Sequence, residues 1–95
     1  VSAEEVEVAL MAVPGVVEAA VFALPDAMRG ERVVAVIVPG AELTEEGVRA
    51  ALRDRLSVFK IPRRVLFMPR DALPRTHSGK VRKSLLADMV AQMPE

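Results

Sequence analysis

The sequence predicts one small α+β domain over residues 1–95, with the order α-β-β-α-β-α and a three-stranded mixed sheet packed by helices. Two observations carry this prediction. Apolar residues recur at helical spacing in three segments, and three apolar runs of strand length are interspersed with them. Pro and Gly separate most of these segments, as they do at turns.

The first helix is predicted between Ser2 and Pro14. Ser2 and Glu5 have the spacing of a capping box, in which each side chain satisfies the other residue's free backbone amide. The apolar stripe that follows consists of Val6, Ala9, Leu10 and Val13. Pro14 and Gly15 then end the helix.

Two strands are predicted next. The segment VVEAAVFAL, residues 16–24, is a strand that Pro25 and Asp26 bring to an end. The segment RVVAVIV, residues 32–38, is β-branched without alternation, which predicts a strand covered on both faces. Asp26 and Gly30 lie between these strands, where a turn explains them better than a catalytic carboxylate does.

A second helix, capped by Thr44, is followed by a third strand. The apolar stripe of this helix consists of Val48, Ala51, Leu52 and Leu56. Residues 60–63 form a connector that Pro62 prevents from being helical, and residues 65–68 form the strand. Because a helix joins it to the preceding strand, we expect the third strand to lie parallel to a neighbour.

The last helix is predicted to begin at Lys80, directly after a turn at Gly79. Its apolar residues are expected to form one face, consisting of Val81, Leu85, Leu86, Met89, Val90 and Met93. Gly79 permits backbone angles that other residues avoid, so it can turn the chain sharply at this point.

The composition narrows the classes of function. Hydrophobic residues make up 52% of the chain, but the aromatic ones are three Phe, which argues against a base-stacking nucleic-acid surface. The chain has no Cys and a single histidine, His77, with no other metal-binding residues close to it in the sequence. We therefore expect no metal site, and we expect His77 to face solvent. The lack of Cys fits a cytoplasmic protein. The longest apolar run, residues 33–38, is too short to span a membrane.

The net charge of zero conceals an asymmetry. Residues 1–48 hold nine acidic and two basic residues, whereas residues 49–83 hold eleven basic and two acidic residues. One side of the domain could therefore face an anion. The alternative is that acidic and basic elements simply pack beside each other.

The segment Ser78-Gly79-Lys80 raises the question of phosphate binding. It is not a P-loop, because that motif needs Gly where Pro74 stands and Ser or Thr where Val81 stands. A lysine at the start of a helix would nevertheless suit an anion, as a compact cation on a flexible stem. From these residues alone, a solvated basic helix start remains the simpler alternative.

Four segments carry a resemblance to a known family. They are SAEEVEVALMAVPGVVEAAVFALPD, GERVVAVIVP, FKIPRRVLFM and LPRTHSGKVRKSLL. The third is similar to the YKVP segment of acyl-CoA synthetases, and the fourth to the signature LP-[RK]-T-x-[ST]-G-K. Together they resemble the small C-terminal domain of the adenylate-forming acyl-CoA synthetases, a superfamily that includes luciferases and peptide synthetase adenylation domains. The resemblance covers nearly the whole chain in the family's order.

The resemblance implies that Lys80 stands at the family's catalytic lysine, with Thr76, Ser78 and Gly79 in the loop that meets ATP and the adenylate. In this family a carboxylate attacks the α-phosphorus of ATP, giving an acyl-adenylate and pyrophosphate. A preplaced ammonium would stabilise the negative charge of that step. The C-terminal domain is thought to rotate afterwards, so that the thiol of CoA can attack.

The resemblance also implies what the full-length enzyme requires. ATP, Mg²⁺ and CoA would be its co-substrates and ion, together with a carboxylic acid. A large N-terminal domain and a hinge would precede Val1, so we expect the chain to be an excised fragment that is inactive alone. In related ligases, protein acetyltransferases reversibly acylate this lysine, which makes Lys80 a candidate for the same regulation.

The residues around Lys80 suggest a subfamily. Peptide synthetase domains tend to read NGKVDR here, whereas this chain reads SGKVRK from residue 78 to residue 83, which favours a free-standing CoA ligase. Arg53 and Lys60 are candidates for contacting the phosphates of CoA. The alternatives are a small basic module that binds nucleic acid, and a stand-alone interaction or anion-binding module without catalysis. The sequence shows neither a GXXG clamp nor an aromatic RNA-binding strand.

Overall fold

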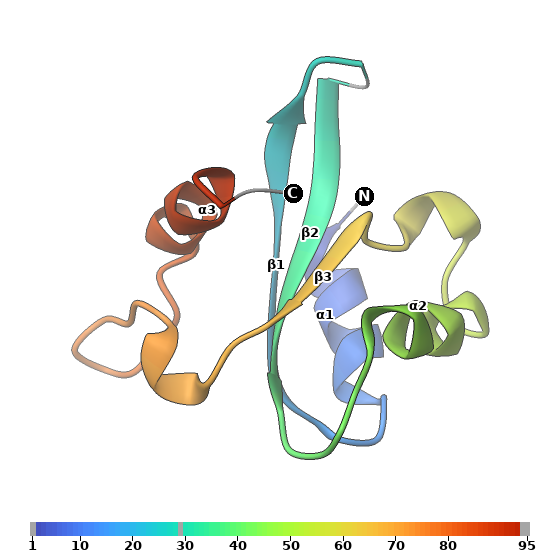
Figure 1. The fold of residues 1–95 in the computed structure, drawn as a ribbon, viewed down its shortest axis with the longest axis horizontal. Coiled ribbons are helices and arrows are strands. Elements are labelled where there is room, and N and C mark those ends of the chain that lie inside the picture. Colours follow the sequence, from blue (N-terminus) through green and yellow to red (C-terminus); the bar gives the residue numbers. More distant parts are fainter. Residues whose placement is uncertain (1, 29, 94–95) are drawn as a thin grey trace.

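The computed structural model describes residues 2–28 and 30–93, which Figure 1 shows as a ribbon. In chain order they form α1 (Ala3–Met11), β1 (Val16–Asp26), β2 (Gly30–Pro39), α2 (Glu45–Arg53), β3 (Arg64–Phe67) and α3 (Lys83–Ala91). Short 3-10 turns at Val58–Lys60 and Arg70–Ala72 flank β3. The predicted α+β class and the order α-β-β-α-β-α are confirmed.

The strands form one mixed sheet in the order β1-β2-β3. β1 and β2 are antiparallel, and at the end of their hairpin Asp26 accepts a 2.8 Å hydrogen bond from the backbone N–H of Met28. This bond is typical of a turn, as predicted for Asp26. β3 lies parallel to β2, with Val65 opposite Ala35, and the connection between them runs through α2. The predicted parallel third strand is therefore confirmed.

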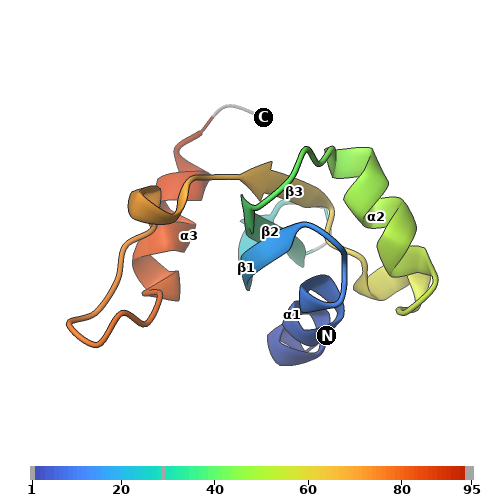
Figure 2. The same cartoon turned by 90° about the horizontal axis from the view of Figure 1, so that it is seen from below.

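Both faces of the sheet are covered by helices. Figure 2 shows α1 and α2 on one face and α3 on the other. Successive residues of β2 alternate between two core clusters, because neighbouring side chains of a strand point to opposite faces. Ala35 and Ile37 belong to the cluster that includes Leu10 of α1 and Leu52 of α2. Val34, Val36 and Val38 of β2 belong to the cluster that includes Leu86 and Val90 of α3.

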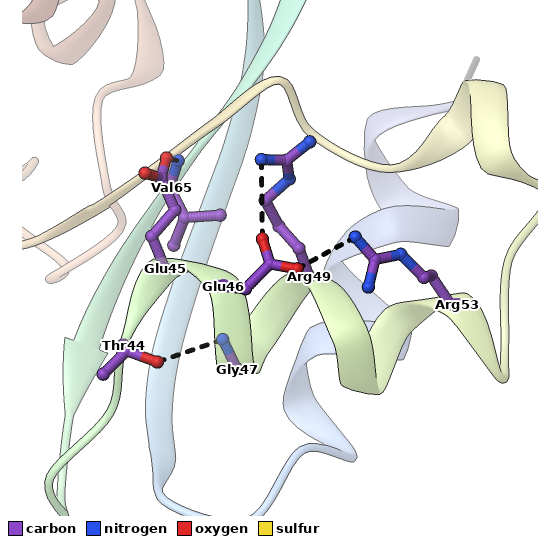
Figure 3. A network of polar contacts seen from close by, with 7 residues as sticks. All are labelled: Thr44, Glu45, Glu46, Gly47, Arg49, Arg53 and Val65. Atoms are coloured by element: carbon purple, nitrogen blue, oxygen red, sulfur yellow. Dashed lines mark hydrogen bonds and ion pairs between the residues drawn. The ribbon is translucent and has the colours of Figure 1, made fainter.

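The first two helices begin at the predicted capping residues. The hydroxyl of Ser2 accepts a hydrogen bond of 3.4 Å from the N–H of Glu5, which confirms that half of the predicted capping box. The reciprocal bond from Ser2 to Glu5 stays a prediction, and the carboxylate of Glu5 lies 3.1 Å from the ammonium of Lys60. The hydroxyl of Thr44 accepts a 3.0 Å bond from the N–H of Gly47, as Figure 3 shows. Each cap satisfies a backbone donor that the first helical turn leaves free.

The start of α3 corrects the sequence prediction. The helix begins at Lys83 rather than at Lys80, because the backbone of residues 80–82 pairs with residues 74–76 and is not available for a helical turn. The single apolar face was also wrong in part. Leu86 and Val90 are buried, but Leu85 and Met89 are each 39% exposed.

The two outer strands each receive a carboxylate from a helix. On β1, the N–H of Val21 donates a 2.8 Å hydrogen bond to Glu7 of α1. On β3, the N–H of Val65 donates a 2.7 Å bond to Glu45 of α2. An outer strand leaves one row of backbone groups without a neighbouring strand. In both strands a side chain therefore takes the place of a strand partner at one position.

Candidate functional site

The residues around Lys80 form a small hairpin, residues 74–82, which we call the Lys80 hairpin. The N–H of Thr76 donates to the carbonyl of Lys80 at 2.8 Å, and the N–H of Arg82 donates to the carbonyl of Pro74 at 2.8 Å. Arg75 and Val81 form the bridge between the two arms. Lys80 thus lies in the second arm of a hairpin, and the predicted position at a helix N-terminus is wrong.

Thr76 and Gly79 shape the tip of this hairpin. The hydroxyl of Thr76 accepts a 3.2 Å hydrogen bond from the N–H of Lys80 and lies 3.0 Å from the hydroxyl of Ser78. Gly79 has a φ of +89°, a left-handed conformation that a side chain would strain, although the space around it is open. The turn prediction for Gly79 is therefore confirmed, and the structure brings Thr76, Ser78, Gly79 and Lys80 together in one loop.

The tip of the Lys80 hairpin projects into solvent. Residues 76–80 are all exposed, including His77, whose predicted solvent-facing position is confirmed. Within residues 2–28 and 30–93, the ammonium of Lys80 takes part in no ion pair. Its charge is therefore not paired with a carboxylate of these residues.

Arg75 ties the base of the Lys80 hairpin to the sheet. Its two terminal nitrogens lie 2.9 Å and 2.7 Å from the two carboxylate oxygens of Glu18 on β1. The same nitrogens donate to the carbonyls of Gly79 at 3.1 Å and of Arg70 at 3.3 Å. In the sequence, Arg75 is one of the eleven basic residues between positions 49 and 83. No local pattern marks its partner, because Glu18 lies 57 residues earlier in the chain.

The pair changes the titration of both groups. The hydrogen bond from Arg75 lowers the pKa of Glu18, and the positive charges of Arg75 and Arg70 act in the same direction while burial opposes them. The hydrogen bond to Glu18 raises the pKa of Arg75, to which the charge of Asp71 also contributes. Both shifts favour the charged forms, as expected for a hydrogen-bonded ion pair.

This shift predicts an acid-dependent loss of stability. The stabilisation from Glu18 is fully present above its pKa in the unfolded chain, about 4.3. It is lost as the pH falls through the lower pKa of the folded state. Acidification from about pH 5 to about pH 3 should therefore lower the free energy of unfolding more in the wild type than in Glu18→Gln. Urea unfolding of both proteins at each pH measures this difference, and equal losses would contradict the prediction.

The other predicted binding residues lie elsewhere. Arg53 of α2 pairs with Glu46 at a distance of 3.0 Å, a contact that is drawn in Figure 3. Lys60 pairs with Glu5 at 3.1 Å. The Lys80 hairpin lies beside α3, whereas α2 covers the opposite face of the sheet (Figure 2). The structure therefore does not bring Arg53 together with Lys80.

A hollow of about 470 Å³ lies near the connector between α2 and β3. Its lining includes Phe59, Ile61 and Arg63 from the connector and Arg32 from β2. Phe59 is 75% exposed, which is unusual for a large aromatic side chain. The basic residues of this connector are visible in the sequence. The position of the hollow is not, and its lining includes Arg63 but not Arg53.

The described residues show two further features that bear on function. Within residues 2–28 and 30–93, no group of three or more His, Cys, Asp or Glu side chains is arranged to hold a metal ion. The helices in the same part of the chain are too short or too polar to cross a membrane.

Comparison with known proteins identifies the family. Residues 5–80 match the family described as the AMP-binding enzyme C-terminal domain. The chain belongs to this family. The match to the AMP-binding C-terminal domain includes Lys80 as its last residue.

Related proteins and solved structures agree with this assignment. Oxalate–CoA ligase of Arabidopsis thaliana is 33% identical over 96 residues, which cover 99% of this chain and 18% of the ligase. Salicylyl-CoA synthase / salicylate adenylyltransferase of a Streptomyces species is 44% identical over 93 residues, covering 95% of this chain and 16% of that enzyme. The crystal structure of ATP-bound MatB from Rhodopseudomonas palustris matches with a TM-score of 0.88 and 40% identity, covering 97% and 18% of the two chains. The AMP-binding C-terminal domain described here thus spans less than a fifth of each of these relatives.

Proposed function

We propose that this chain is the mobile C-terminal domain of an AMP-forming acid–CoA ligase and that it supplies Lys80 as the catalytic positive charge of adenylation. The observation that carries the proposal is the Lys80 hairpin. It presents a lysine whose charge is not paired within the described residues, on a loop whose base is tied to the sheet. A surface lysine on a flexible loop would lack this attachment to the sheet.

The proposed reaction has two steps. In the first, a carboxylate oxygen of the acid attacks the α-phosphorus of ATP, and the bond to pyrophosphate breaks, leaving an acyl-adenylate. In the second, the thiol of CoA loses its proton and attacks the acyl carbon, and AMP leaves. Lys80 acts in the first step by stabilising the negative charge on the phosphoryl oxygens, without transferring a proton.

The relatives support both steps. One of them carries the names of a salicylyl-CoA synthase and a salicylate adenylyltransferase, which correspond to thioester formation and to adenylation. The MatB structure contains ATP. By the same reasoning, ATP and CoA are the proposed co-substrates of the full-length protein, with Mg²⁺ accompanying ATP. A carboxylic acid is the remaining substrate, and its pocket lies outside this chain.

The two faces of the domain suit two different steps. The Lys80 hairpin lies on the α3 side of the sheet, whereas Arg53 and Lys60 belong to the segment on the α1 and α2 side (Figure 2). We propose Arg53 and Lys60 as contacts for the phosphates of CoA once the domain has rotated. The phosphates would have to displace the carboxylates of Glu46 and Glu5, which hold these side chains now.

The partner of the domain would be the N-terminal adenylation domain of the same polypeptide. That domain would provide the nucleotide and acyl pockets, so residues 1–95 alone should not form acyl-adenylate. The exposed ammonium of Lys80 is also open to a protein acetyltransferase. Acylation would remove its positive charge and thereby stop adenylation.

The proposed function is tested with the full-length protein. We expect acid-dependent exchange of labelled pyrophosphate into ATP for at least one member of a broad panel of carboxylic acids. Addition of CoA should then yield one acyl-CoA and one AMP for each ATP consumed. Thioester formation accompanied by ADP and phosphate, or the absence of ATP consumption with every acid, would refute the proposal. Residues 1–95 alone are the matched negative control.

A further inference from the structure

We propose that Arg75 and Glu18 form a clamp that positions the Lys80 hairpin for adenylation, so that both are positioning residues for the reaction. This inference rests on the proposed function. The clamp links β1, a strand of the sheet, to the loop that carries Lys80. Neither residue would need to touch the substrates, because both act through the place that they give to Lys80.

The geometry of Arg75 supports a positioning role. Each terminal nitrogen bonds one carboxylate oxygen of Glu18 and also a backbone carbonyl, that of Gly79 or that of Arg70. Gly79 directly precedes Lys80, so the bond to its carbonyl fixes the peptide group from which Lys80 extends. A planar guanidinium can satisfy these acceptors together, whereas an ammonium acts as a single point of attachment.

The surroundings make this clamp effective. The side chains of Arg75 and Glu18 are 19% and 29% exposed, so water screens their attraction less than it does for pairs on the surface. The lowered pKa of Glu18 agrees with a strong hydrogen bond between them. Residues 76–80 at the tip are all exposed, and the bond from Arg75 to the carbonyl of Gly79 links this tip to the clamp. Without the clamp, the position of Lys80 would depend on the hairpin's own hydrogen bonds.

The test uses the full-length enzyme with Glu18→Gln and Arg75→Gln. Both variants should lower kcat for acyl-adenylate formation by roughly 10- to 100-fold, the scale of a misplaced catalytic group. The KM values for ATP and the acid should change far less. Thioester formation from supplied acyl-adenylate and CoA should stay at the wild-type rate. Arg75→Lys, which keeps a cation within reach of Glu18, should lose less activity than Arg75→Gln.

A second measurement separates positioning from a loss of stability. Hydrogen exchange of the full-length variants should become faster in residues 74–82 and stay unchanged in the buried part of α3. The matched control is Glu7→Gln, the same isosteric change in the ion pair that Glu7 makes with Lys83. This control should leave both adenylation and the exchange of residues 74–82 unchanged.

The possible failures are distinguishable. If the wild-type protein does not adenylate any acid, the proposed function fails. If the wild type is active, the clamp is refuted by Glu18→Gln and Arg75→Gln variants with normal adenylation. The clamp is also refuted if both half-reactions slow in parallel, because the pair would then contribute only to folding. Unchanged hydrogen exchange of residues 74–82 would refute it as well, because the pair would then not hold the hairpin.

Discussion

Replacement of Lys80 with alanine in the full-length protein is expected to slow acyl-adenylate formation by roughly 10²- to 10³-fold, or more. This is the scale of losing one preorganised donor that stabilises the charge of a transition state. Because Lys80 is exposed and its side chain makes no ion pair within residues 2–28 and 30–93, we expect the substitution to leave the fold unchanged. The exchange of labelled pyrophosphate into ATP measures the loss.

The thioester step provides the internal control for this variant. Lys80→Ala should convert supplied acyl-adenylate and CoA into acyl-CoA at the wild-type rate. Arg82→Ala, which removes an exposed positive charge two residues away, should retain adenylation close to the wild-type rate. Normal adenylation by Lys80→Ala, or an equal loss in Arg82→Ala, would show that Lys80 has no specific role.

Replacement of Leu86 with alanine is expected to lower the free energy of unfolding of residues 1–95 by about 2–5 kcal/mol. Leu86 is fully buried, in the cluster that joins α3 to the sheet. Its truncation would leave a cavity within that cluster. Urea unfolding at neutral pH measures the change as a lower midpoint with an unchanged slope.

The neighbouring residue offers a matched control for Leu86. Leu85→Ala removes the same atoms from the same helix, but Leu85 is 39% exposed. We expect a smaller cost of about 1 kcal/mol, because 39% of the surface of Leu85 stays in contact with water and its truncation leaves a smaller cavity. Equal losses for the two variants would mean that α3 does not pack against the sheet through Leu86.

Much of the fold could be predicted because its signals are local. Ser2 and Thr44 mark two helix starts through bonds to residues three positions later. The β-branched segment of β2 indicated a strand covered on both faces, and its residues do enter two cores. The crossover through α2 then restricted β3 to a parallel neighbour.

The site was less predictable because its determinants are not local. Val81 fits the apolar spacing of α3, yet its backbone pairs with Arg75, a competing interaction that hydrophobic periodicity does not reveal. Glu18 is an ordinary glutamate on a strand until the fold brings Arg75 beside it. Only the resemblance to a family singles out Lys80, since a solvated basic helix start is the simpler interpretation of its residue type and neighbours.

The carboxylates on the outer strands have a consequence if the domain rotates as proposed. A proposed rotation between two reaction steps would expose different surfaces of this domain to water at different times. Glu7 and Glu45 each occupy a backbone donor on an outer strand, so an extended segment of another molecule would have to displace a carboxylate before it could pair there. This arrangement disfavours edge-to-edge association, the first step of aggregation in sheet proteins, without restricting the rotation itself.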